Sequence, residues 1–285
     1  MAEIPSHGRL AEVPSTARVV GVLAWAQVRA QLSYRRSFTA DVAGQLAFVG
    51  QLAFVGLDFV ELFAVLRRAP TIGGLDFRSL FLVFALAQLG FALGSLVLGQ
   101  FDRVHERVRT GTIETVLVRP FSPLLQIATD DVALRRVGRL AAALVVLPVA
   151  LHLAPVDWTP ARVALTVATP LCGAVVFGAL FVLSGSISFW LVDGSEFGHA
   201  FTYGSNYLSQ WPVGVLPTVL SRLFTFVLPA AFVAYLPALV VLDRTDTGPV
   251  PAWVCWGAPF AGLWTVALAA GAWRLALRHH TGAGG

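Results

Sequence analysis

Long apolar blocks constrain the fold of this chain more than any other feature. Crossing the ~30 Å hydrocarbon layer of a bilayer takes about 20 apolar residues, and several blocks reach roughly that length. Hydrophobic residues make up 56% of the 285 residues and charged residues only 13%, where soluble domains carry about 25% charged residues. We therefore predict an all-α membrane protein and exclude soluble enzymes. The regular blocks are 42–65, 78–99, 139–155, 162–190 and 252–274.

The apolar stretch 197–242 differs because prolines interrupt it. It is too long for one crossing, and Pro212, Pro217, Pro229 and Pro237 leave no room for two regular helices. We predict a fifth helix that ends near Trp211, followed by a re-entrant or surface-lying hairpin over 212–242. Non-helical backbone at that depth must be buried against protein or water. With this helix the chain has six predicted transmembrane helices.

The ends of the chain are polar. Residues 1–16 are predicted to be a flexible N-terminus, and 277–285 a flexible C-terminus. Residues 17–38 mix apolar side chains with four arginines, which fits an amphipathic helix lying in the membrane interface. The six-span domain then covers 39–276, with a long polar segment at about 100–138. An exact hexapeptide repeat at 44–55 lies inside the first span and is too short to form a structural unit.

The sequence contains twenty arginines and no lysine. Their distribution predicts the orientation, because cytoplasmic loops of membrane proteins are rich in basic residues. Fourteen lie in 1–38, 100–139 and 274–278, five lie in the connections expected on the opposite side of the membrane, and Arg222 lies in the proline-rich segment. Both termini are therefore predicted to be cytoplasmic, at the cell membrane. The basic balance is attributed to membrane lipids, and no nucleic-acid partner is expected.

The absence of lysine also limits the chemistry. A Walker A phosphate loop needs a lysine, so the chain is not expected to bind ATP by that motif. No Ser/His/Asp arrangement indicates catalysis, and the two cysteines are interpreted as small hydrophobic residues. We expect a protein that is not an enzyme and that binds no cofactor or metal itself.

The polar segment at 100–138 contains the most distinctive local pattern. Charges alternate at helical spacing from Asp102 to Arg109, which predicts a cytoplasmic extension of the second span. Gly111 breaks this run, and Thr112 with Glu114 opens a short helix that ends before Pro120. Such a helix suits the groove of a soluble partner. The alternative is a solvated loop held near anionic lipid.

Two stretches resemble a known family. The run from Arg109 to Pro120, with Gln126 beyond it, and the run from Tyr207 through Arg222 to Pro237 are similar to membrane subunits of type-2 ATP-binding-cassette (ABC) exporters. They look most like the branch of stand-alone permeases without an ATPase domain. The resemblance implies a cytoplasmic coupling helix between spans two and three. It also implies re-entrant helices between spans five and six.

The resemblance further implies a separate ABC ATPase in two copies, which binds ATP and Mg, and a second copy of this permease or a paralogous one. The residues implied in coupling to that ATPase are Arg109, Gly111, Thr112, Glu114, Leu117, Arg119 and Pro120. The transported substrate stays undefined, because no residue selects among lipids, peptides, antibiotics and glycans.

Three ionisable residues in apolar segments are candidate intramembrane polar sites: Asp58, Glu61 and Arg222. Asp58 and Glu61 would form a substrate or proton site, or pair with Arg67, Arg68 or Arg78 at the outer interface. Arg222 must reach the interface or a carboxylate, and Asp243 is the nearest candidate.

Two other function classes remain as alternatives to a permease. An ion-coupled secondary transporter usually shows inverted repeats, and none is evident between 42–138 and 162–274. A membrane-embedded enzyme would need clustered His, Asp and Glu at helical spacing.

Overall fold

The computed structural model describes residues 50, 56–57, 60–61, 63–65, 67–130, 134–191 and 194–279. The chain divides into two compact units, 1–35 and 36–285, and every described residue belongs to the second. The predicted N-terminal segments 1–16 and 17–38, the hexapeptide repeat but for Gly50, most of the first span, Asp58 and residues 280–285 lie outside the described residues.

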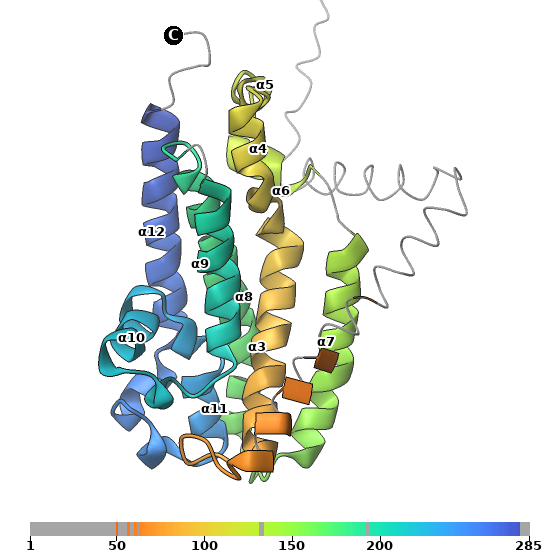
Figure 1. The fold of residues 1–285 in the computed structure, drawn as a ribbon, viewed down its shortest axis with the longest axis vertical. Helices are drawn as coiled ribbons and strands as arrows, with labels where there is room; N and C mark the ends of the chain where they lie inside the picture. Colours follow the sequence, from red (N-terminus) through yellow and green to blue (C-terminus); the bar gives the residue numbers. More distant parts are fainter. Residues whose placement is uncertain are drawn as a thin grey trace, which may run out of the picture. The chain divides into compact units, whose positions relative to one another are not determined.

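The described residues form helices and turns without a named strand (Figure 1). The α-helices are α3 (Phe77–Leu98), α4 (Val104–Arg109), α5 (Ile113–Leu117), α6 (Pro123–Ala128), α7 (Leu134–Leu153), α8 (Pro160–Ile187), α9 (Gly194–Ser209), α10 (Thr218–Arg222), α11 (Tyr235–Val241) and α12 (Ala258–His279). Short 3₁₀ or π segments are η1 (Gly99–Arg103), η2 (Val213–Val215), η3 (Leu223–Val227), η4 (Ala230–Phe232), η5 (Thr245–Thr247) and η6 (Ala252–Trp256).

Helices α3 and α8 form the centre of the bundle, and glycines let them approach closely. A Cβ at Gly90 would lie 3.3 Å from the Cα of Gly173, and a Cβ at Gly94 would lie 2.9 Å from the carbonyl oxygen of Ala174. Small residues four apart permit such contact between membrane helices. The pair Gly90 and Gly94 therefore marks a real helix–helix contact, with α8 as the partner.

Four helical segments are long and apolar enough to span a membrane: Phe77–Arg109, Arg136–Leu153, Pro160–Ile187 and Ala258–His279. They match the predicted second, third, fourth and last spans. The first predicted span is mostly undescribed. The predicted fifth helix is α9, whose 16 residues extend about 24 Å at 1.5 Å per residue, short of the ~30 Å hydrocarbon layer.

The proline-rich segment forms two helical pieces, Thr218–Val227 and Ala230–Val241, bent by 69° at Leu228–Pro229. Proline cannot continue the helical hydrogen bonds, so a break at this position follows from the sequence. The pair counts as a fifth span if it crosses, or as a re-entrant loop if it returns. All seven residues of α11 are buried.

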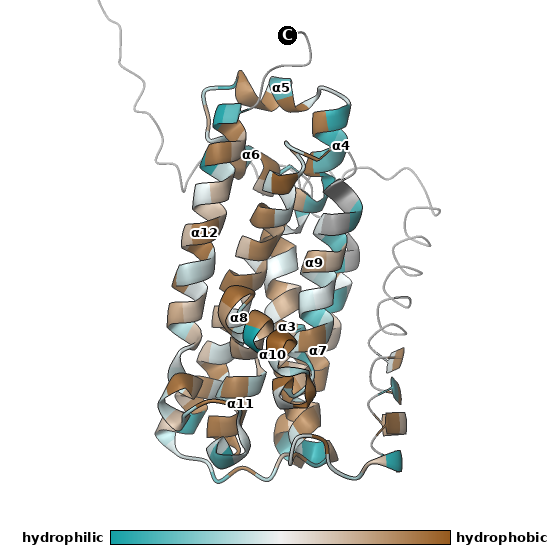
Figure 2. Cartoon of the chain, turned by 60° about the vertical axis from the view of Figure 1, so that its left-hand side comes forward, coloured by the Kyte–Doolittle hydropathy of each residue, from teal (hydrophilic) through white to brown (hydrophobic). Residues whose placement is uncertain are grey.

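The ends of the bundle are distinct. Helices α4 and α5 and the C-terminal end of α12 lie at one end, and α10 and α11 lie toward the other (Figure 1). Hydrophobic residues dominate α3 and α8, whereas α4 is largely hydrophilic (Figure 2). The common end of α5 and the α12 terminus agrees with the prediction that the polar segment and the C-terminus share one side of the membrane.

Candidate functional site

The candidate site is the polar segment between α3 and α7, which begins as an extension of α3. Helical structure runs from Phe77 to Arg109 with little interruption, so the predicted helical extension of the second span is confirmed, and its cytoplasmic location stays a prediction. It ends where Gly111 adopts a φ of +72°, a left-handed conformation that glycine adopts without strain. The reversal at Gly111 places α5 directly beyond the end of α4.

Helix α5 buries one face and exposes the other. Ile113 is fully buried and Val116 nearly so, and both belong to the main hydrophobic core. Of the residues predicted to couple to a partner, Arg109, Thr112, Glu114, Arg119 and Pro120 are exposed, while Gly111 and Leu117 are half-buried. The structure thus brings the predicted residues together around one short helix at the end of the bundle.

The start of α5 agrees with the prediction in position but not in detail. Thr112 occupies the position before the first helical residue, yet its hydroxyl does not cap the helix. Instead the Thr112 hydroxyl lies 3.0 Å from that of Thr110 and donates to the Arg107 carbonyl at 3.4 Å. Thr112 therefore supports the turn at Gly111.

Two side-chain interactions hold the segment in place. The amide nitrogen of Gln126, on α6, donates to the carbonyl oxygens of Val116 at 3.1 Å and Phe121 at 2.8 Å. Arg107 on α4 forms an ion pair with Asp130, just after α6. These contacts tie both ends of the turn that follows α5 to the neighbouring helices.

Val118 and Phe121 are the residues that sequence reasoning missed. Val118 is 85% exposed and Phe121 52% exposed, although both are apolar. They flank Arg119 and Pro120, so the turn presents a small apolar surface with a positive charge in its middle. Contiguous exposed apolar surface marks interaction sites with other proteins or with membranes. The only signal in the sequence is their place beside Pro120.

Of the intramembrane candidates, Glu61 has a described side-chain partner, and it is a tyrosine. Glu61 accepts a hydrogen bond from the Tyr207 hydroxyl of α9 at 2.5 Å. No ion pair joins it to Arg67, Arg68 or Arg78 in the described part of the chain. A second tyrosine of α9, Tyr203, donates to Asp102 at 3.0 Å, so two hydroxyls on one face of α9 contact carboxylates.

For Arg222 we predicted contact with the interface or with a carboxylate, and the nearest candidate, Asp243, pairs with a different arginine. Asp243 lies 3.1 Å from Arg162 at the start of α8. Arg222 is exposed in the last turn of α10. The reason is the fold of the proline-rich segment, which carries Asp243 past the end of α11 to the first turn of α8.

Metal and thiol chemistry have little support in the described residues. They contain no group of three His, Cys, Asp or Glu side chains that could hold a metal ion. Cys255 is buried and Cys172 half-buried, and both are free thiols. Their packing agrees with the interpretation of both cysteines as small hydrophobic residues.

The described residues form a bundle of membrane-length helices with a polar turn at one end, which agrees with a multi-pass membrane protein. The sequence model of a family described as ABC-2 family transporter protein matches residues 52–284. The chain therefore belongs to the ABC-2 family of transporter membrane proteins. A search of curated proteins finds no match.

Proposed function

We propose that the chain is the permease subunit of an ATP-driven exporter, and that a separate ABC ATPase drives it. The ABC-2 family membership supports the transport role. The observation that carries the ATPase coupling is the exposed turn of Val118–Phe121, which Gln126 fixes to α6. The Arg107–Asp130 ion pair in turn ties α4 to the chain just after α6. A rigid turn with apolar contacts transmits a push from a soluble partner into α3.

The assembly that we propose contains two permeases and two ATPase subunits. The permeases are two copies of this chain or this chain and a paralogue. The ATPase binds ATP and Mg, and the permease supplies the surface formed by Arg109, Gly111, Thr112, Glu114, Leu117, Arg119 and Pro120. ATP closes the ATPase pair. The closed pair and the open pair each favour a different arrangement of the spans.

The proposed topology has six spans in the cell membrane, with both termini and α5 in the cytoplasm. Residues 17–38 lie in the cytoplasmic interface as an amphipathic helix, and 212–242 form a re-entrant segment on the outer side. Arginine distribution supports this orientation. In a variant without Cys172 and Cys255, we expect a membrane-impermeant maleimide to label Trp253→Cys in intact cells. Val118→Cys should react only after lysis, and the reverse pattern would overturn the orientation.

The central experiment is co-purification of the chain with its ATPase in detergent, followed by assays of ATP hydrolysis and transport. Alanine substitutions at Glu114, Arg119 and Pro120 are expected to uncouple hydrolysis from export, while membrane insertion stays normal. Normal transport by all three variants would contradict the coupling assignment. An ion-coupled secondary transporter is the alternative, and transport that follows an ion gradient without ATP would establish it.

A further inference from the structure

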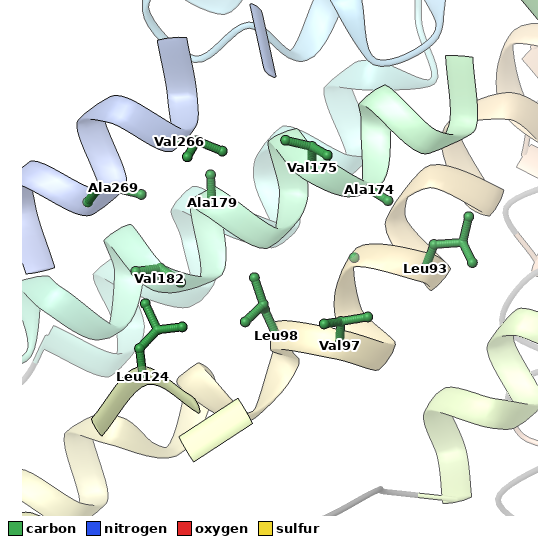
Figure 3. A pocket seen from close by; sticks show the side chains of 12 residues that line it. Leu93, Val97, Leu98, Leu124, Ala174, Val175, Ala179, Val182, Val266 and Ala269 are labelled. Atoms are coloured by element: carbon green, nitrogen blue, oxygen red, sulfur yellow. The ribbon is translucent and has the colours of Figure 1, made fainter. Parts of the chain in front are cut away.

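A groove with a volume of about 410 Å³ lies between α3, α8 and α12, and Leu124 of α6 lines one end of it (Figure 3). Its floor is formed by buried small residues, among them Gly94 and Ala179. Val97, Val175 and Val266 lie on its rim and are exposed. The groove is therefore open to the outside of the helical bundle.

The lining consists entirely of Leu, Val, Ala and Gly. Water is not stabilised in such a groove, because a bound water needs two to four polar partners. Along α8 the lining extends from Ala174 to Val182, roughly 12 Å at 1.5 Å per residue. That length fits within one leaflet of the bilayer, which is about 15 Å of hydrocarbon. A hydrocarbon chain matches both the polarity and the length.

A positive charge follows the groove on α12. Ala270 lines the groove, and Arg274 is one turn further along the same face of the helix. Arg274 is exposed, and it has no carboxylate partner among the residues that the structure describes. Arg278 repeats the same spacing one turn beyond. An arginine at this position suits a phosphate group, which it binds through two parallel hydrogen bonds.

We propose that this groove binds an anionic glycerophospholipid, with one acyl chain between α3, α8 and α12 and the phosphate on Arg274. The end of the groove nearer Arg274 also includes Leu124 of α6, so the bound chain touches the segment that carries α5. The site is independent of the proposed ATPase coupling, because it requires only the permease and the lipid.

The test uses the purified full-length chain in detergent, titrated with phosphatidylglycerol or phosphatidylcholine, with bound lipid measured by native mass spectrometry. We expect one tightly held lipid per chain and a preference for phosphatidylglycerol. Arg274→Gln should weaken phosphatidylglycerol binding about fivefold, the value of one arginine near an anionic lipid, and leave phosphatidylcholine unchanged. Ala270→Leu fills the groove and should weaken both lipids.

Two matched controls accompany these variants. Arg244→Gln removes an exposed charge at the other end of the bundle, and Ala267→Leu enlarges an exposed alanine of α12 outside the groove lining. Both should bind lipid as the wild type does. Equal binding of the two lipids by wild type, or unchanged phosphatidylglycerol binding by Arg274→Gln, would overturn the proposal. So would an Ala270→Leu variant that loses self-association but binds lipid normally, because the groove would then hold a second copy.

Discussion

The two ends of the bundle are stabilised in different ways. At the α11 end, all seven residues of the helix are buried, and van der Waals packing of apolar side chains holds the segment. At the α5 end, only Ile113 and Val116 of the five helical residues are buried. There the backbone is positioned by Gln126 and by the Arg107–Asp130 ion pair, and the apolar Val118 and Phe121 remain exposed.

This difference separates an end whose apolar side chains are buried in the fold from the end that we propose contacts the ATPase. Apolar side chains that the fold does not need for its own core are available for another protein. Exposed side chains also occur at the α10 part of the other end, where Val219 and Phe226 are exposed. Those residues lie in an apolar segment that qualifies as part of a membrane span, so lipid accounts for them. The segment around α5 is polar, and its exposed pair is the surface that we propose contacts the ATPase.

The largest expected effect is on ATPase binding. The double variant Val118→Ala, Phe121→Ala should lose affinity for the ATPase, at about 2 kcal/mol for each anchor residue if both are hot spots. Copurification and ATPase stimulation should fall by well over tenfold. The matched control is Val219→Ala, Phe226→Ala at the other end, which should bind the ATPase normally. Equal binding by both double variants would remove the distinction between the two ends.

The second prediction concerns the free energy of unfolding, for which the larger effect is expected at the α11 end and the smaller one at the α5 end. Leu239→Ala in α11 removes a fully buried side chain and should lower the free energy of unfolding by about 2–5 kcal/mol. Val118→Ala removes an exposed side chain and should change it by less than about 0.5 kcal/mol. Unfolding in mixed micelles measures both. A Val118→Ala variant as unstable as Leu239→Ala would show that the turn belongs to the core.

Much of this contrast follows from the sequence. Hydropathy predicted α3, α7, α8 and α12, because membrane-length apolar blocks have few other solutions. Gly111 predicted the turn before α5, because the run of alternating charges from Asp102 to Arg109 ends just before it and glycine adopts a positive φ without strain. The spacing of Gly90 and Gly94 is compatible with a close helix–helix contact, but only the structure identifies α8 as the partner.

The remaining features depend on distant parts of the chain. Hydropathy favours burial of Val118 and Phe121, and only the packing of α5 on the core decides that they are exposed. Gln126 donates to the carbonyl oxygen of Val116, ten residues earlier in the chain. Arg162, at the start of α8, pairs with Asp243, which follows α11 in the sequence. Such pairings follow from the path of the backbone, and no local pattern encodes them.

A smaller effect is expected from the hydrogen bonds that hold the α5 turn. Gln126→Met keeps the size of the side chain but removes both donations to the backbone, at about 1 kcal/mol for each bond. We expect weaker ATPase stimulation with normal membrane insertion. Thr129→Val is the control on the same connection, because it removes only local bonds to the α6 backbone. If both variants stimulate the ATPase equally, Gln126 does not position the turn.

The smallest effect is expected at the two ion pairs, one at each end. In Arg107–Asp130 and Arg162–Asp243 the carboxylate side chains are 47% and 80% exposed, so each pair contributes about 0–1 kcal/mol. Asp243→Asn keeps a residue type that tolerates the φ of +57° at this position. It should lower stability slightly and leave ATPase stimulation unchanged.

Asp130→Asn should lower stability by a similar amount but also weaken ATPase stimulation, because Asp130 fixes the segment that carries α5. Thermal unfolding and ATPase assays at low and high salt separate the two outcomes, since salt screens exposed pairs. An effect of Asp243→Asn on stimulation as large as that of Asp130→Asn would mean that the α11 end also takes part in coupling.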